Sequence, residues 1–172
     1  MKLYGDHEVD ILDDHGNVIG VKAHKDVDKS REILHVVYSF VVTPDGRLLL
    51  SRIPRDPAKK NLFPGKLGVT VATVLRHDEH HLDAAKRSLA KEIGITNPDL
   101  QFLGETMEAF HNCPKRLISA YICTANESDI KPNLEDVEQL IPVTRAELEE
   151  LLDRNEFAPT LLTLWDRYSE EL

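Results

Sequence analysis

Residues 67–95 constrain the fold of this chain more than any other segment. They begin with a run of apolar and β-branched residues, 67–75, whose composition is typical of a strand. A polar loop follows, and residues 82–93 then predict a helix that ends at Gly94. The helix carries one apolar stripe, formed by Leu82, Ala85, Leu89 and Ile93. A strand that leads through a loop into a half-buried helix needs a sheet on which that helix can pack.

The rest of the chain is predicted to consist mainly of strands, beginning with a hairpin at about residues 8–22. The predicted strands cover residues 8–12, 18–22, 33–43, 48–53, 100–110, 117–124 and 139–143. Thr144 and Glu147 form a capping box that begins a helix, and a last helix starts at Pro159, so helices occupy about residues 144–170. Strands, one central helix and two late helices predict an α+β fold, with a mixed sheet covered by helices on both faces.

Composition narrows the class of protein. The chain has 172 residues, 41% of them hydrophobic and 30% charged, which is ordinary for one globular domain spanning residues 1–172. Its formal net charge of −9 argues against binding to duplex nucleic acid or to an anionic membrane, because both need clustered cations. Cys113 and Cys123 form neither a metal pair nor a disulfide framework, and the N-terminus has no apolar signal segment. We therefore expect a cytoplasmic protein.

The segment 73–95 resembles the Nudix box, G-x5-E-x7-R-E-U-x-E-E-x-G-U, in which U is a bulky aliphatic residue. Six fixed positions of the box are matched, by Glu79, Arg87, Leu89, Glu92, Gly94 and Ile95. Three positions depart from it: Thr73 stands for the first Gly, Ser88 for the Glu after the Arg, and Lys91 for the first Glu of the pair. With its flanking segments the resemblance covers roughly residues 34–152. It implies a Nudix fold, an α/β/α sandwich with a mixed sheet.

The N-terminal hairpin looks most like the branch of Nudix proteins that includes isopentenyl-diphosphate isomerase. By this resemblance, the isomerases need a catalytic Cys and a metal-binding His in the strand before the box. Ala72 and Val74 stand at about these positions here. Neither side chain can protonate a carbon atom or bind a cation, so we do not expect isomerase activity.

The resemblance implies that Mg²⁺ or Mn²⁺, held by glutamates of the box helix, bridges the diphosphate of a substrate. Positions 88, 91 and 92 are expected to share a helix face, because residues three and four apart are neighbours. This chain offers Ser88, Lys91 and Glu92 there, so their charges cancel. A unit charge pair about 4 Å apart is worth about 4 kcal/mol at an effective dielectric constant of about 20. We therefore expect a weak metal site that depends on Glu92.

Two alternatives to this metal site stay open. Lys91 itself would bind a phosphate as a point charge. The loop from His77 to His81, with Asp83, would instead assemble a transition-metal site, since imidazole suits such ions. The simpler interpretation of this loop, a solvated turn whose acids favour the start of the next helix, is preferred.

Other candidate residues lie outside the helix face. Arg52, Arg55, Lys59 and Lys60 form a dense cationic stretch, which either lines the mouth of a substrate site or is a surface loop. By resemblance, Glu79 and Arg87 form a structural pair within the box. Glu105 and Glu108 are candidates for a water-activating carboxylate outside it, whereas His111 and Cys113 are expected to be incidental. These candidates are assigned by resemblance and position, and their roles are expectations.

Two functions of different class follow. The first is a Nudix-type hydrolase of a nucleoside-diphosphate-linked or other organic diphosphate, with an impaired metal site. The second is a catalytically inactive Nudix-fold protein that binds a phosphorylated ligand or a protein partner. In either case the expected ligand is a small-molecule diphosphate or nucleotide, and the resemblance makes a homodimer plausible.

Overall fold

The computed structural model describes residues 6–59, 61–110 and 113–172. Its strands are β1 (Glu8–Leu12), β2 (Val18–Ala23), β3 (Leu34–Val42), β4 (Leu48–Arg52), β5 (Leu67–Gly68), β6 (Val71–Val74), β7 (Gln101–Phe110), β8 (Cys113–Thr124) and β9 (Gln139–Val143). Its α-helices are α1 (His81–Ile93), α2 (Arg145–Leu151) and α3 (Pro159–Tyr168). In the described part of the chain, no helix is both long enough and apolar enough to cross a membrane.

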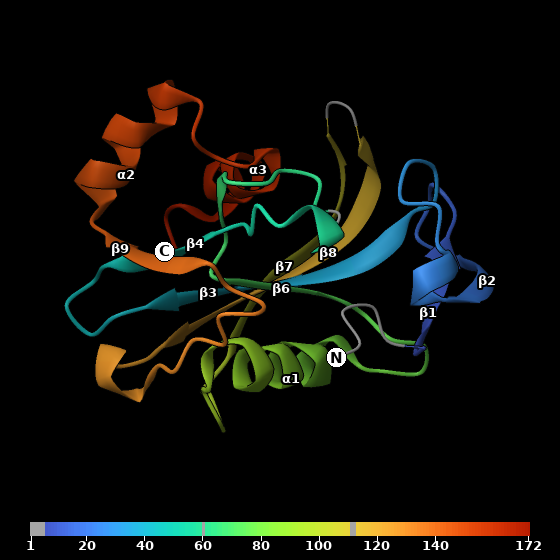
Figure 1. Cartoon of the computed structure of the whole chain (residues 1–172), viewed down its shortest axis with the longest axis horizontal. Coiled ribbons are helices and arrows are strands. Elements are labelled where there is room, and N and C mark those ends of the chain that lie inside the picture. Colours follow the sequence, from blue (N-terminus) through green and yellow to red (C-terminus); the bar gives the residue numbers. More distant parts are fainter. Residues whose placement is uncertain (1–5, 60, 111–112) are drawn as a thin grey trace.

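A mixed sheet forms the middle layer of the molecule. Its path runs β5-β4-β3-β8-β7, with β6 added beside β3 and β9 beside β4. The β3–β8 pair is parallel, and the other pairs of the sheet are antiparallel. Helix α1 covers one face, while α2 and α3 lie on the other side (Figure 1). The α+β class, the mixed sheet and the two helical layers expected from the sequence are thus confirmed.

The element boundaries follow the sequence prediction closely, with two differences. Strand β8 begins at Cys113 rather than at residue 117. The run 67–75 is divided into β5 and β6 at Thr70, whose hydroxyl bonds to the backbones of β4 and β3. Thr70 Oγ1 donates to the Leu49 carbonyl and accepts the Val41 N–H at 3.0 Å. The chain therefore leaves β4 after Gly68 and pairs with β3 from Val71 onward.

Helix α1 is the element that carries the box. Its apolar stripe is confirmed, since Ala85, Leu89 and Ile93 are fully buried against the sheet. The helix ends at Gly94, whose φ of +73° lies in the left-handed region that favours glycine. A Cβ at this position would lie 3.1 Å from Cβ of Lys131, so the loop after β8 packs closely on the end of α1.

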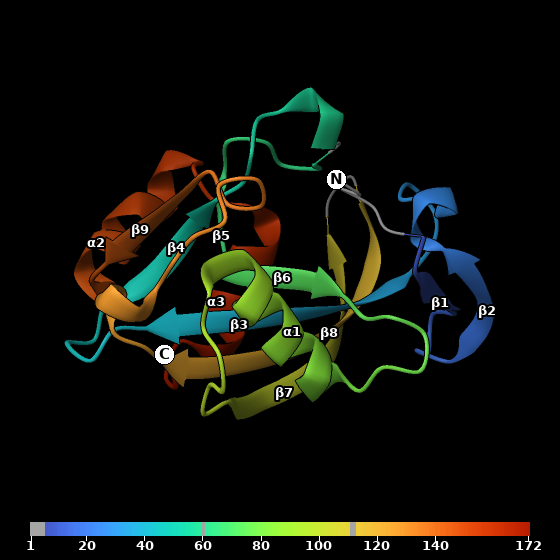
Figure 2. The same ribbon diagram turned by 60° about the horizontal axis from the view of Figure 1, so that its bottom comes forward.

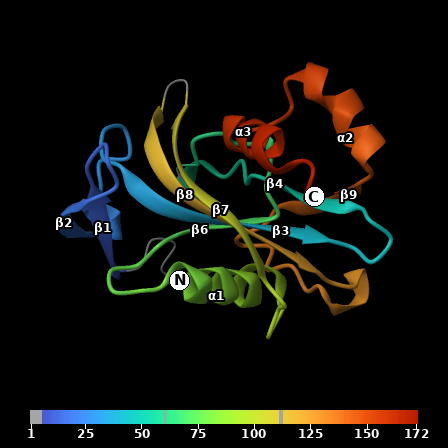
Figure 3. The same cartoon turned by 180° about the vertical axis from the view of Figure 1, so that it is seen from behind.

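The N-terminal hairpin, β1 and β2, forms a small separate sheet at one end of the molecule (Figure 2). Strand β1 is its buried half: Val9 is fully buried and joins the same core as α3. The hairpin also holds the loop that precedes α1. The Glu8 carbonyl accepts the His77 N–H at 2.8 Å, and Asp10 lies 2.7 Å from Nδ1 of His77. Seen from behind, the hairpin and α2 stand at opposite ends of the sheet (Figure 3).

Candidate functional site

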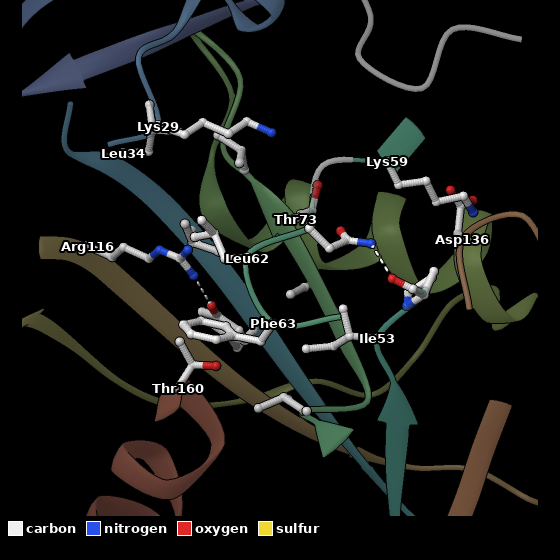
Figure 4. Close-up of a pocket in the computed structure, with 18 of the residues that line it drawn as sticks. Lys29, Leu34, Ile53, Lys59, Leu62, Phe63, Thr73, Arg116, Asp136 and Thr160 are labelled. Atoms are coloured by element: carbon white, nitrogen blue, oxygen red, sulfur yellow. Dashed lines mark hydrogen bonds between the residues drawn. The ribbon is translucent and has the colours of Figure 1, made fainter. Parts of the chain in front are cut away.

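A cavity of about 380 Å³ opens beside the C-terminal half of α1 and extends over β6 and β3. A volume of this size is typical of small-molecule sites. Its apolar middle contains Ile53, Leu62 and Phe63, and Figure 4 shows these side chains between two charged ends. One end contains Lys59, Lys91, Glu92, Glu135 and Asp136, and the other contains Lys29, Glu32, Lys115 and Arg116.

The box-helix end of the cavity is built where α1 meets the loop that precedes β9. The Asn133 N–H donates to the Glu92 carbonyl at 2.7 Å, and this bond fixes the loop on the last turn of the helix. Lys91 Nζ lies 3.6 Å from Oδ1 of Asp136. Lys59, from the loop after β4, points toward the same carboxylate (Figure 4). Lysine and carboxylate side chains are therefore interleaved at this end.

Glu92 lies at this end and has an unusual proton affinity. Burial, followed by the neighbouring Asp136 carboxylate, raises the pKa of its carboxyl to about 8. Lys91 and Arg87 act in the opposite direction but do not compensate. Near neutral pH the Glu92 carboxyl is therefore mainly protonated.

Ser88 precedes Glu92 by four residues on α1 and so lies on the same side of the helix, but it is not among the residues that line the cavity. It is buried, with 1% of its surface exposed, and its hydroxyl donates to the Ala85 carbonyl at 3.0 Å. The small side chain lies on the side of α1 that packs on the sheet. Lys91, one turn later, is 59% exposed at its side chain. Position 88 is thus part of the packing of the helix.

The residues present do not fit a carboxylate-held Mg²⁺ or Mn²⁺. Such hard cations need several oxygen ligands, yet Ser88 is turned inward, Lys91 brings a positive charge, and Asp136 faces that charge. Over residues 6–59, 61–110 and 113–172, no group of three His, Cys, Asp or Glu side chains is placed to hold a metal ion.

The histidine-rich loop before α1 does not converge on a metal position either. His77 turns to Asp10, and His80 caps α1 by accepting the Leu82 N–H at 3.2 Å. His81 bonds to the Tyr121 hydroxyl. The preferred interpretation of this loop was a solvated turn whose acids favour the start of the helix; in the structure His80 caps α1, and Glu79 pairs with Arg87.

Glu79 and Arg87 form an ion pair that braces the loop before α1. Arg87 Nε lies 2.7 Å from Oε1 of Glu79, and Nη2 donates to the other carboxylate oxygen at 2.9 Å. Burial raises the pKa of Glu79, but hydrogen bonds from Arg87 and from the Arg76 backbone outweigh it, and the pKa is lowered. Arg87 also donates to Oγ1 of Thr73 at 3.2 Å. Thr73, at the position of the box glycine, thus contacts the same arginine that pairs with Glu79.

The cationic stretch after β4 divides between the cavity and the surface. Lys59 lines the cavity. Arg52 instead donates to the Gly65 carbonyl at 2.9 Å, and Arg55 forms an ion pair with Glu138. Neither of these arginines is among the lining residues. Lys60 lies outside the described residues.

The structure does not bring Glu105 or Glu108 to Glu92. Both are on β7, which is separated from β6 by β3 and β8. Glu105 accepts the Ser119 hydroxyl at 2.9 Å, and Glu108 forms an ion pair with Arg167 of α3. Of the other positions considered, His111 lies outside the described residues, and Cys113, at the start of β8, does not line the cavity.

Asp136 and Arg116 are two of the lining residues that belong neither to the box nor to the cationic stretch. Asp136 follows Glu135 in the sequence before β9. This pair of adjacent acids was the feature of the sequence that could have indicated it. Arg116 lies on β8, and only the parallel β3–β8 pairing places it beside Tyr38. Ala72 and Val74 also line the cavity, and their side chains carry no group that could move a proton.

Comparison with known proteins agrees with the resemblance. The family model described as NUDIX domain matches residues 19–164. An uncharacterized Nudix hydrolase of Yersinia pestis is 31% identical over 87 residues, which cover 51% of this chain and 46% of that protein. Another, from a Nostoc strain, is 30% identical over 115 residues, covering 66% and 64%. The chain thus spans less than two thirds of the length of either relative.

Solved structures share the fold at low sequence identity. DR0079 of Deinococcus radiodurans has a TM-score of 0.77 at 18% identity, covering 94% of this chain and 99% of that one. The NUDIX domain of NrtR from Shewanella oneidensis, crystallised with ADP ribose, has a TM-score of 0.63 at 16% identity, covering 80% and 87%. At these identities the likeness shows a shared fold.

Proposed function

This chain belongs to the Nudix family, and on that premise we propose that its cavity binds an organic diphosphate of the nucleoside-diphosphate-linked class, with metal-dependent hydrolysis strongly impaired. One observation carries this proposal: at the box-helix end, an inward-turned Ser88 and the Lys91 ammonium stand where the family places glutamates. A lysine favours a phosphate oxygen and repels a divalent cation.

The composition of the cavity supports a diphosphate ligand. Its charged lining in the described chain consists of five lysine or arginine side chains and four acids, in a protein whose net charge is −9. Lys59 and Lys91 approach from a loop and from a helix, so a diphosphate between them would be held from two sides. Phe63 and Leu62 offer an apolar surface to a base or another organic group.

A structural neighbour supplies a suitable probe. The NUDIX domain of Shewanella oneidensis NrtR was crystallised with ADP ribose, which is a nucleoside-diphosphate-linked compound. We carry this ligand class over to the present chain as part of the proposal. ADP ribose is therefore the first ligand to test.

A working hydrolase is the second candidate function. The observation in its favour is Asp136, which places another carboxylate beside Glu92. Glu135 lines the same end of the cavity. Glu105 and Glu108 would have to act from another part of the sheet.

Binding and turnover measured together separate the two functions. Binding of ADP ribose would be followed by calorimetry in EDTA, where Lys91→Ala should weaken affinity about tenfold, roughly 1.4 kcal/mol. Lys86→Ala removes an exposed lysine of the same helix that does not line the cavity, and it should have little effect.

Product formation would be measured on nucleoside-diphosphate-linked and isoprenoid diphosphates with Mg²⁺, Mn²⁺, Zn²⁺ or EDTA, beside Glu92→Gln. Metal-independent binding without turnover supports the main proposal. Turnover that EDTA and Glu92→Gln both abolish supports the hydrolase. Neither binding nor turnover, in protein shown to be folded, contradicts the diphosphate proposal and leaves the protein-partner alternative.

A further inference from the structure

An arginine that pairs with no acid in the described part of the chain lines the end of the cavity opposite Lys59 and Asp136 (Figure 4). Arg116 Nη1 donates to the Tyr38 hydroxyl at 2.8 Å, and its guanidinium carbon lies 5.9 Å from the centre of the Phe110 ring. Neither contact neutralises its charge. Within the described ranges, no carboxylate forms an ion pair with Arg116.

The acids that lie nearest in the fold are engaged elsewhere. Glu108 is opposite Arg116 in the β7–β8 register, but its carboxylate pairs with Arg167 and accepts the Thr106 hydroxyl. Glu32 also lines the cavity, yet it forms an ion pair with Lys22 and accepts the Asp28 N–H at 2.7 Å. The guanidinium thus keeps its charge, and only one of its five N–H donors is used by Tyr38.

Two lysines accompany Arg116 at this end. Lys29 lines the cavity, and in Figure 4 its side chain runs along the upper edge, with its ammonium end between Arg116 and Lys59. Lys115 also lines the cavity, and its Nζ lies 3.1 Å from Oδ1 of Asp14. The box-helix end has two lysines and three acids in its lining, whereas this end has three cations and one acid, Glu32, around a partly buried arginine. We call Lys29, Lys115 and Arg116 the Arg116 cluster.

We propose that the Arg116 cluster binds a second anionic group of the ligand, a phosphate monoester carried in addition to the diphosphate. This inference rests on the proposed function. A guanidinium matches the oxygens of a phosphate with parallel N–H donors, and a nearby ammonium supplies the second charge that a dianion needs. The ligand class is therefore a nucleoside diphosphate compound that is phosphorylated at a further hydroxyl.

The spacing of the strands suits such a ligand. Strand β3 separates β6, beside α1, from β8, which carries Arg116. Two steps between neighbouring strands correspond to about 10 Å. The apolar residues Ile53, Leu62 and Phe63 lie between the charged ends. A sugar or base would then bridge the two phosphate-bearing positions.

Matched ligand pairs test the inference. Calorimetry in EDTA would compare ADP ribose with its 2′-phosphate, and dephospho-coenzyme A with coenzyme A, because each pair differs only by a phosphate monoester. We expect the phosphorylated member of at least one pair to bind tenfold or more tightly. Arg116→Gln should abolish this difference, and Arg116→Lys should keep part of it. Lys86→Gln, which removes an exposed charge outside the cavity lining, should leave it unchanged.

The outcomes separate this inference from the proposed function. Equal affinity within both pairs overturns the inference while the diphosphate proposal stands. An Arg116→Gln variant that weakens both members equally also overturns it, since Arg116 would then serve the diphosphate. Absence of binding by all four ligands contradicts the proposed function itself. If Arg116→Gln fails to fold by circular dichroism, Lys29→Gln and the wild-type comparison give the same decision.

Discussion

At the scale of single residues, Glu92 links the stability of the protein to pH. Its folded-state pKa of about 8 lies above the ordinary value of 4.5, so the native state holds a proton that the unfolded state has lost. The contribution of Glu92 to stability should therefore fall as pH rises from about 4.5 to about 8 and level off above that, whereas the lowered pKa of His24 acts in the opposite direction below about 6.5. The slope is at most about 1.4 kcal/mol per pH unit.

The Glu92→Gln variant should remove this pH dependence, because glutamine does not titrate. The measurement is urea unfolding at a series of pH values between about 5 and about 9, which covers most of the range between the two pKa values and extends above the higher one. Glu150→Gln, an exposed position on α2, is the matched control and should retain the wild-type slope. A slope that persists in Glu92→Gln would assign the proton uptake to another group.

Helical spacing predicts which residues lie on the same side of α1. It does not predict how deeply a small polar residue beside the apolar stripe is buried. The apolar stripe and the presence of Lys91 and Glu92 near a site followed from that spacing. The inward position of Ser88 did not, because a serine is equally acceptable at a surface and in close helix packing. Its burial shows only through the bond to the Ala85 carbonyl and the contact of α1 with the sheet.

At the scale of elements, the end of α1 should depend on glycine at position 94. Gly94→Ala would place a side chain at φ +73° and bring its Cβ within 3.1 Å of Lys131. We expect a loss of about 1–2 kcal/mol in the free energy of unfolding. Gly20→Ala is the control, because its φ is not positive and its added Cβ would meet no atom within 4 Å. Equal stability of the two variants would contradict this role of Gly94.

The strands were predicted well because each carries its own apolar run and turn residues, as in the hairpin through Gly46. The division of residues 67–75 was not predictable in this way. Strands β5 and β6 have compositions typical of a single strand, and only the presence of both β4 and β3 as partners separates them at Thr70. Pairing across long sequence distances decides such cases.

At the scale of the whole molecule, the N-terminal hairpin should contribute to global stability through one of its two strands. Val9 on β1 is fully buried in the main core, whereas Val18 on β2 is 57% exposed. Val9→Ala should lower the free energy of unfolding by about 2 kcal/mol. Val18→Ala should change it by less than about 0.5 kcal/mol. Thermal unfolding of both variants would show a separate early transition if the hairpin were instead an independent unit.

The candidate site could be predicted only in part from the sequence, because some of its residues come together through contacts between distant segments. The box aligned Lys91 and Glu92, and the cationic stretch indicated Lys59. The opposite end of the cavity could not be found, because Arg116 becomes a neighbour of Tyr38 only across 78 residues of chain. A motif describes one segment, whereas this cavity is lined by several.

The parallel pairing of β3 with β8 also affects how the chain folds during synthesis. The cavity is incomplete until the ribosome has released β8. An N-terminal fragment that ends before residue 113 lacks the lining residues Pro114, Lys115 and Arg116. Contacts of such long range make folding slow. During that interval one edge of β3, from Leu34 to Val42, keeps its backbone N–H and C=O groups without the strand that pairs with them in the folded protein.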